Sequence, residues 1–121
     1  MRKVEWTDDA LILHFTGLTS VAALKKEIKI PYSSIENVES NGFDISAFHF
    51  RIGTSGIGKN LREGRFLQNG EWIFLSYLHH EKVVVLTLKN HDYKKVVFEV
   101  EEPEQMREQI MKKVLENREE H

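Results

Sequence analysis

The chain contains no cysteine, and this absence excludes several kinds of chemistry at once. Disulfide bonds, thiolate metal ligands and cysteine nucleophiles are ruled out, and a lack of cysteine is consistent with a reducing compartment. The sequence also lacks an apolar run of about 18 residues and a charged-then-apolar leader, so it predicts neither a membrane-spanning helix nor a secretory signal. We therefore expect a cytoplasmic protein.

An excess of charge of one sign is missing as well. The sequence has 17 basic and 19 acidic residues, which gives a formal charge of −2. Domains that bind nucleic acid usually carry a strongly basic face. We therefore expect no nucleic-acid partner, and any site for an anion has to be a local cluster of bases.

Catalytic and metal-binding patterns are also absent. The paired Ser33 and Ser34 lack the Gly-x-Ser-x-Gly turn of serine hydrolases, and the acids cluster in turns and near the C-terminus rather than as a catalytic pair. His79 and His80 are adjacent, and neighbours in an extended segment point to opposite faces, so they do not readily share one ion. The sequence predicts no enzyme, no cofactor and no metal site.

The strongest pattern that is present lies in residues 93–118. Alternation of Val96, Phe98 and Val100 predicts a half-buried strand over residues 95–100, and Pro103 suits the first position of a helix. After Glu104, apolar residues recur at spacings of three and four, which predicts one amphipathic helix that covers a sheet with Met106, Ile110, Met111, Val114 and Leu115.

The rest of the chain has the pattern of short strands joined by turns. Alternating or apolar stretches between turns predict strands over residues 4–6, 10–16, 22–30, 35–39, 48–52, 65–68, 72–78 and 83–88. Asn69-Gly70 predicts a two-residue hairpin turn, because both residues accept positive φ.

The segment 72–78 is apolar on both faces, so we interpret Trp72, Phe74 and Tyr77 as core residues, whereas residues 53–64 form one long irregular segment. The patterns together predict an α+β, mainly β, single domain over residues 1–121, with its core at 4–117 and a frayed tail at 118–121.

Five stretches in a fixed order carry a likeness to a known family: Lys-Ile-Pro-Tyr-Ser-Ser-Ile-Glu-Asn-Val at 29–38, Phe-Arg-Ile-Gly-Thr-Ser at 50–55, Gly-Arg-Phe at 64–66, the strand at 83–88, and Glu-Pro-Glu-Gln at 102–105. Over nearly its whole length the chain resembles the bacterial pleckstrin-homology-like (PH-like) domains.

The resemblance implies a seven-stranded antiparallel, partly open barrel closed by one C-terminal helix. It also implies a binding or scaffolding module rather than an enzyme, and some members of the family form homo-oligomers. Eukaryotic PH domains bind phosphoinositides through bases around their first loop. The corresponding residues 17–20 carry no base here, so we do not expect that mode of binding.

Four bases in and around the glycine-rich segment are the candidate ligand-binding residues: Arg51, Lys59, Arg62 and Arg65. Glycines let backbone amides approach an anion closely, although bases in a loop are also commonly inert surface charges. Residues 53–60 approach the phosphate-loop pattern, but Asn60 replaces the required Ser or Thr and no helix follows, so nucleotide hydrolysis is not predicted.

Phe48 and Phe50 are the candidate interface residues, because both lie on a short predicted strand with few apolar neighbours. Our first hypothesis is a non-catalytic binding or scaffolding domain that acts through protein contacts, including self-association, because an exposed strand edge offers unpaired backbone groups to another copy or to a peptide. The alternative is that the bases of residues 51–65 bind an anionic lipid, at the periphery of a membrane, or a small phosphorylated ligand.

Overall fold

The computed structural model describes residues 2–15, 26–40, 62–68, 70–77 and 79–120. These residues form eight strands in two sheets and one C-terminal helix, which confirms the mainly β, α+β class. The resemblance to the PH-like domains implied seven strands. The three-stranded sheet has the order β1-β2-β3 and consists of β1 (Arg2–Trp6), β2 (Ala10–Phe15) and β3 (Lys26–Pro31). The predicted strand at residues 48–52 lies outside the described residues.

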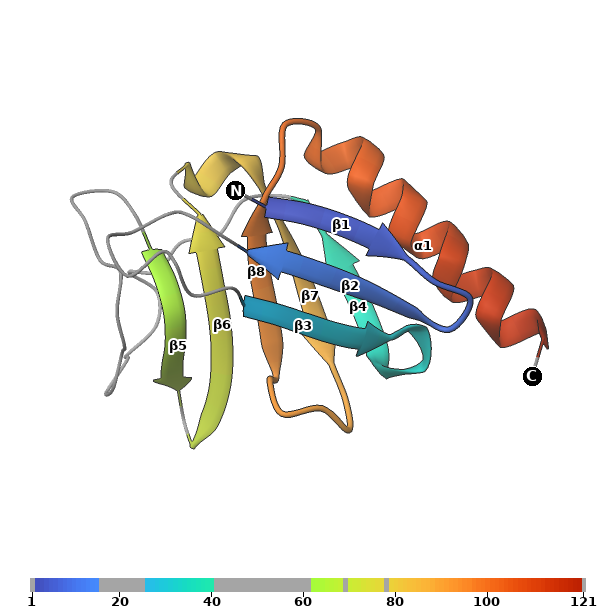
Figure 1. Cartoon of the computed structure of the whole chain (residues 1–121), viewed down its shortest axis with the longest axis horizontal. Helices are drawn as coiled ribbons and strands as arrows, with labels where there is room; N and C mark the ends of the chain where they lie inside the picture. Colours follow the sequence, from blue (N-terminus) through green and yellow to red (C-terminus); the bar gives the residue numbers. More distant parts are fainter. Residues whose placement is uncertain (1, 16–25, 41–61, 69, 78, 121) are drawn as a thin grey trace.

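The five-stranded sheet has the order β4-β7-β8-β6-β5 (Figure 1). Its strands are β4 (Ile35–Glu39), β5 (Arg62–Gln68), β6 (Glu71–Tyr77), β7 (Val83–Leu88) and β8 (Lys95–Glu99). The two sheets are not closed on each other by strand pairing among the described residues, so the expected barrel is not confirmed.

The expectation of wholly antiparallel strands is wrong at one pair. β8 pairs antiparallel with β7 on one side and parallel with β6 on the other. The chain reverses direction between β6 and β7 and again between β7 and β8, so β8 runs in the same direction as β6. β8 therefore lies between β6 and β7 instead of at the edge of the sheet.

Strand periodicity places two separate apolar clusters on the faces of the five-stranded sheet. The larger cluster joins one face of this sheet to the inner face of the three-stranded sheet and to the helix, and it includes Leu13, Ile30, Phe74, Phe98 and Ile110. The smaller cluster occupies the opposite face, with Ile73, Leu75, Tyr77, Val83, Val85 and Val97. β6 is therefore buried on both faces, which confirms Phe74 and Tyr77 as core residues, whereas Trp72 packs against the larger cluster while partly exposed.

The hairpin of β5 and β6 confirms the turn predicted at residues 69–70. Gln68 pairs with Glu71 across the turn, so two residues connect the strands. Gly70 has φ of 80°, a left-handed conformation that glycine adopts without a steric cost.

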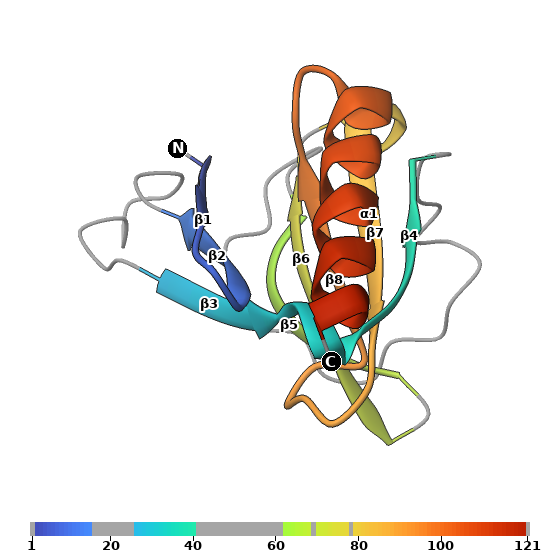
Figure 2. The ribbon, with the colours of Figure 1, turned by 90° about the vertical axis from the view of Figure 1, so that its right-hand side faces the viewer.

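The helix α1 (Pro103–Glu120) begins at the predicted proline and packs against β4, β7 and the 3-10 turn η1 (Tyr32–Ser34). Figure 2 shows α1 standing between the three-stranded sheet and β4. α1 also includes residues 118–120, which the sequence placed in a frayed tail. No helix in the part of the chain that the structure describes has the length and apolar character to cross a membrane.

The apolar stripe of α1 is narrower than the sequence predicts. Ile110 and Val114 are buried, and Met106 and Met111 pack against the same cluster while partly exposed. Leu115 is 50% exposed, so its prediction as a covering residue is wrong. Consecutive helical residues are about 100° apart, and position 115 lies beyond the edge of the stripe centred on Ile110 and Val114.

Two side chains connect elements that lie far apart in the sequence. Tyr32, at the point where the chain passes from one sheet to the other, donates its hydroxyl hydrogen to the carbonyl of Thr7 at 2.8 Å. His91, in the turn between β7 and β8, has Nε2 2.9 Å from the carbonyl of Lys29 in β3, and its Nδ1 accepts from the backbone N–H of Tyr93 at 3.1 Å. Because a carbonyl only accepts, Nε2 carries the hydrogen.

We expect His91→Ala to lower the free energy of unfolding by about 1 to 2 kcal/mol, because it leaves the Lys29 carbonyl and the Tyr93 amide without their shared partner. Urea titration followed by circular dichroism measures the loss. The control is Asp92→Ala in the same turn, whose exposed side chain predicts a change below about 0.5 kcal/mol. Equal losses in both variants would show that the imidazole does not connect the sheets.

Candidate functional site

The predicted site residues are only partly placed by the structure. Phe48, Phe50, Arg51 and Lys59 lie outside the described residues, so neither the predicted interface nor the full set of bases is tested.

Arg62 and Arg65 lie within β5, whereas the sequence assigned residues 53–64 to an irregular segment. The side chain of Arg65 is described and exposed, whereas that of Arg62 lies outside what the structure describes, so a shared site of the two bases stays a prediction.

The side chain of Arg65 has a partner within the chain. Its guanidinium carbon lies 4.6 Å from the centre of the Trp72 ring. Trp72 follows the hairpin turn and sits beside Arg65 because Leu67 pairs with Trp72 and Arg65 pairs with Phe74. Cation–π contacts of this kind hold an arginine over a ring, so this contact by itself indicates a structural role.

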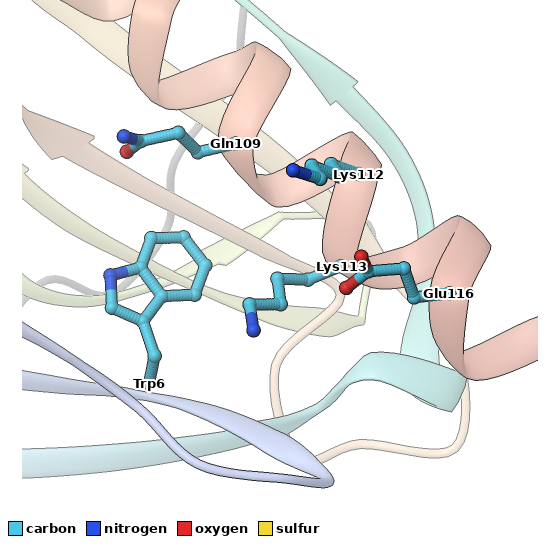
Figure 3. Close-up of a pocket in the computed structure, with 5 residues that line it drawn as sticks. All are labelled: Trp6, Gln109, Lys112, Lys113 and Glu116. Atoms are coloured by element: carbon cyan, nitrogen blue, oxygen red, sulfur yellow. The ribbon is translucent and has the colours of Figure 1, made fainter.

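A different surface, which the sequence did not single out, has the shape of a binding site. Trp6, at the end of β1, points toward α1 across a hollow of about 350 Å³ that is also lined by Gln109, Lys112, Lys113 and Glu116 (Figure 3). Trp6 is half-buried, because part of its ring packs against the main core. An aromatic surface therefore faces two lysines and a glutamate.

The hollow continues in both directions along α1. Toward the C-terminus, Lys113 and Glu116 also line a second hollow of about 380 Å³, together with Asp8, Tyr32 and Asn117. Toward the N-terminus, Gln109 and Lys112 also line a third, of about 270 Å³, with Gln105 and Glu108. Because neighbouring hollows share residues, we describe them as one groove, the β1–α1 groove.

Charges are distributed unevenly along the β1–α1 groove. Lys112 and Lys113 occupy its middle, opposite Trp6, whereas Glu108 lies at one end and Asp8 and Glu116 at the other. At that acidic end, burial raises the pKa of the Tyr32 phenol, and the charges of Asp9 and Asp8 raise it further. The phenol is therefore a neutral hydrogen-bond donor at ordinary pH, as its bond to Thr7 requires.

The strand beside the groove is the edge of its sheet. No described strand pairs with β1 on the side away from β2. The other edge of the same sheet is partly occupied, because the Lys29 carbonyl in β3 bonds to His91. As far as the described strands go, the β1 edge thus has backbone N–H and C=O groups available to another chain.

The groove has the chemistry of a binding surface. Its aromatic ring, amides and mixed charges offer both apolar and polar contacts to a ligand. Among the described residues, no three His, Cys, Asp or Glu side chains are grouped closely enough to hold a metal ion.

Comparison of the chain with protein-family models, with curated proteins and with solved structures gave no match. The resemblance to the bacterial PH-like domains therefore stays a prediction.

Proposed function

We propose that the chain is a non-catalytic binding module that acts through protein contacts, and that it binds an extended segment of its partner along the free edge of β1. The observation that carries the proposal is the combination of an edge with which no described strand pairs and the β1–α1 groove beside it. A strand added to an edge gains main-chain hydrogen bonds along its length, and neighbouring hollows select its side chains.

The composition of the groove supports an extended peptide rather than a small polar metabolite. Trp6 offers a ring face to an apolar side chain, and Lys112 and Lys113 lie across from it, where an acidic side chain of the same peptide would be paired. Amphipathic aromatic residues such as tryptophan are enriched at protein interfaces.

Membership of the bacterial PH-like family is part of this proposal. The two sheets and the C-terminal helix that packs at β4 and β7 support it. The parallel pairing of β6 with β8 departs from the antiparallel arrangement that the resemblance implies.

The alternative function, binding of an anionic lipid or phosphorylated ligand by Arg51, Lys59, Arg62 and Arg65, also stays a prediction. The contact of Arg65 with Trp72 gives it no support.

The test is a titration of the ¹⁵N-labelled chain with peptides selected from a random twelve-residue display library. We expect the largest amide shifts at Lys3 to Trp6 and along the groove-lining side of α1. The control peptide has the same sequence with alternate backbone nitrogens methylated, which removes the donors needed for strand addition. We expect it to bind at least about tenfold more weakly.

Two results would contradict the proposal. One is a selected peptide whose shifts cluster away from β1 and α1, and the other is equal binding of the methylated and unmethylated peptides.

A further inference from the structure

We infer that the β1 edge pairs with the β1 edge of a second copy of the chain, antiparallel, about a two-fold axis through Val4. This inference rests on the proposed function, because it names the partner of the same edge. The pairing would join the two three-stranded sheets into one continuous six-stranded sheet, a closed two-fold arrangement in which each copy offers the same surface.

The charges of β1 are complementary to themselves in this register. When Val4 lies opposite Val4 of the second copy, Lys3 lies opposite Glu5 of the second copy, and Glu5 opposite its Lys3. Both residues are exposed and lie on the outer face of the sheet, since their neighbours Val4 and Trp6 pack against the core. The symmetry produces this oppositely charged pair twice, and opposite charges directly across a strand pair are favourable.

Glu5 keeps capacity for a further contact. Its Oε1 accepts a hydrogen bond from Nε2 of His14 on β2 at 2.8 Å, while its side chain remains 51% exposed. A carboxylate accepts more than one hydrogen bond, so Glu5 can bind the lysine of the second copy without giving up His14.

The β3 edge has a similar sequence but differs in its backbone. Glu27 and Lys29 would also face each other across a two-fold axis at Ile28. However, the Lys29 carbonyl is bonded to His91, and β3 ends in Pro31, which has no N–H to donate. The β1 edge carries neither obstacle among the described residues, so we assign the contact to β1.

The strand pair is short, and its length limits the expected stability of the dimer. Five residues on each side bury far less than the roughly 1,200 Å² at which stable interfaces begin. We therefore expect a weak dimer that dissociates on dilution.

Charge reversal tests the pairing by sedimentation velocity over a range of protein concentrations. Lys3→Glu and Glu5→Lys each place two like-charged pairs across the axis, so each should weaken the dimer about tenfold or more. The double variant Lys3→Glu/Glu5→Lys exchanges the charges and should restore dimerisation to within about threefold of the wild type. Lys29→Glu on β3 is the matched control, because it would place like charges across an axis at Ile28 but not across the β1 axis, and it should leave the dimer unchanged.

Cysteine cross-linking tests the register without depending on charge, and the chain has no cysteine of its own. Residues 3 and 5 of two copies would be about 5 Å apart between Cα atoms, whereas the two copies of residue 3 would be separated by about 8 Å. Disulfides form only below about 7 Å. We expect a mixture of Lys3→Cys and Glu5→Cys to form a disulfide dimer under mild oxidation, and either variant alone to form none.

The outcomes separate this inference from the proposed function. A chain that stays monomeric but binds selected peptides at β1 overturns the inference and leaves the function standing. A dimer that responds to reversal on β3 and not on β1 also overturns it. A monomer that binds no peptide at β1 contradicts both.

Discussion

Tyr32→Ala is expected to lower the free energy of unfolding by about 3 to 5 kcal/mol, the range for removal of a large buried aromatic side chain. The Tyr32 ring is 2% exposed and belongs to the main core. Its backbone N–H donates to the carbonyl of Asp9 at 3.0 Å, and its hydroxyl donates to Thr7. The substitution therefore removes core volume and loosens the contact between the β1–β2 turn and η1.

Urea denaturation measures the loss, with Ser33→Ala as the control in the same turn. Ser33 is exposed, and its change should cost less than about 0.5 kcal/mol. If Tyr32→Ala is too unstable to titrate, Tyr32→Phe keeps the ring and should cost about 1 to 2 kcal/mol, because the Thr7 carbonyl loses its donor. A loss in Tyr32→Phe no greater than that in Ser33→Ala would contradict the role of the hydroxyl.

The wild type and Tyr32→Phe together also test the raised pKa of Tyr32. Below the ordinary tyrosine pKa of about 10, the phenol is neutral in both the folded and unfolded states, so its stabilising effect is fully present. Above that pH the unfolded chain loses the proton while the folded chain keeps it, and the free energy of unfolding falls as pH rises through the higher folded pKa. The stability difference between wild type and Tyr32→Phe should be constant from pH 7 to 9 and shrink above about pH 10.

The second large effect is expected on α1. Ile110→Ala should cost about 2 to 5 kcal/mol, because Ile110 is fully buried between the helix and the sheets. Leu115→Ala, on the same helix, removes a side chain of similar size that is 50% exposed, and should cost less than about 1 kcal/mol. The pair controls for helix propensity, since both variants introduce alanine, the best helix former.

Thermal and urea unfolding of the two variants measure this difference. Equal losses of unfolding free energy in the two variants would mean that α1 packs against the sheets with a different face. The residues that line the β1–α1 groove would then also differ. A costly Leu115→Ala alone would point to a contact on the outer side of the helix.

Local elements of the fold were well predicted by the sequence. Pro103 marks the start of α1, the turn at residues 69–70 connects β5 to β6, and β6 is buried on both faces. These features follow from backbone preference and from the periodicity of apolar residues, which are local properties.

The order of strands could not be predicted in this way. Periodicity shows which face of β8 is buried but not which strands lie beside it, and its position between β6 and β7 depends on non-local pairing. Leu115 was misassigned for a related reason, because a wide apolar stripe in sequence does not show how much of it the sheets can cover.

The candidate groove was missed because its parts are far apart in the sequence. Trp6 belongs to no sequence motif, and Lys112 and Lys113 resemble ordinary surface charges of a helix. Two signals were available: an aromatic residue at the end of a short first strand, and the alternation of Lys3, Glu5 and apolar residues along it. Both signals indicate a binding surface only when β1 is known to be an edge strand beside α1.

The central position of β8 has a consequence for how the molecule folds. β8 is the last strand in the chain, yet it joins β7 to β6 in the middle of the five-stranded sheet. While residues 95–99 are still missing from a growing chain, β6 and β7 have no common partner, and their apolar edges remain open. Contacts between distant parts of a chain are slow to form, and open edges favour aggregation. Synthesis of the last strand is therefore the step that commits this sheet to its final order and ends its exposure to misassembly.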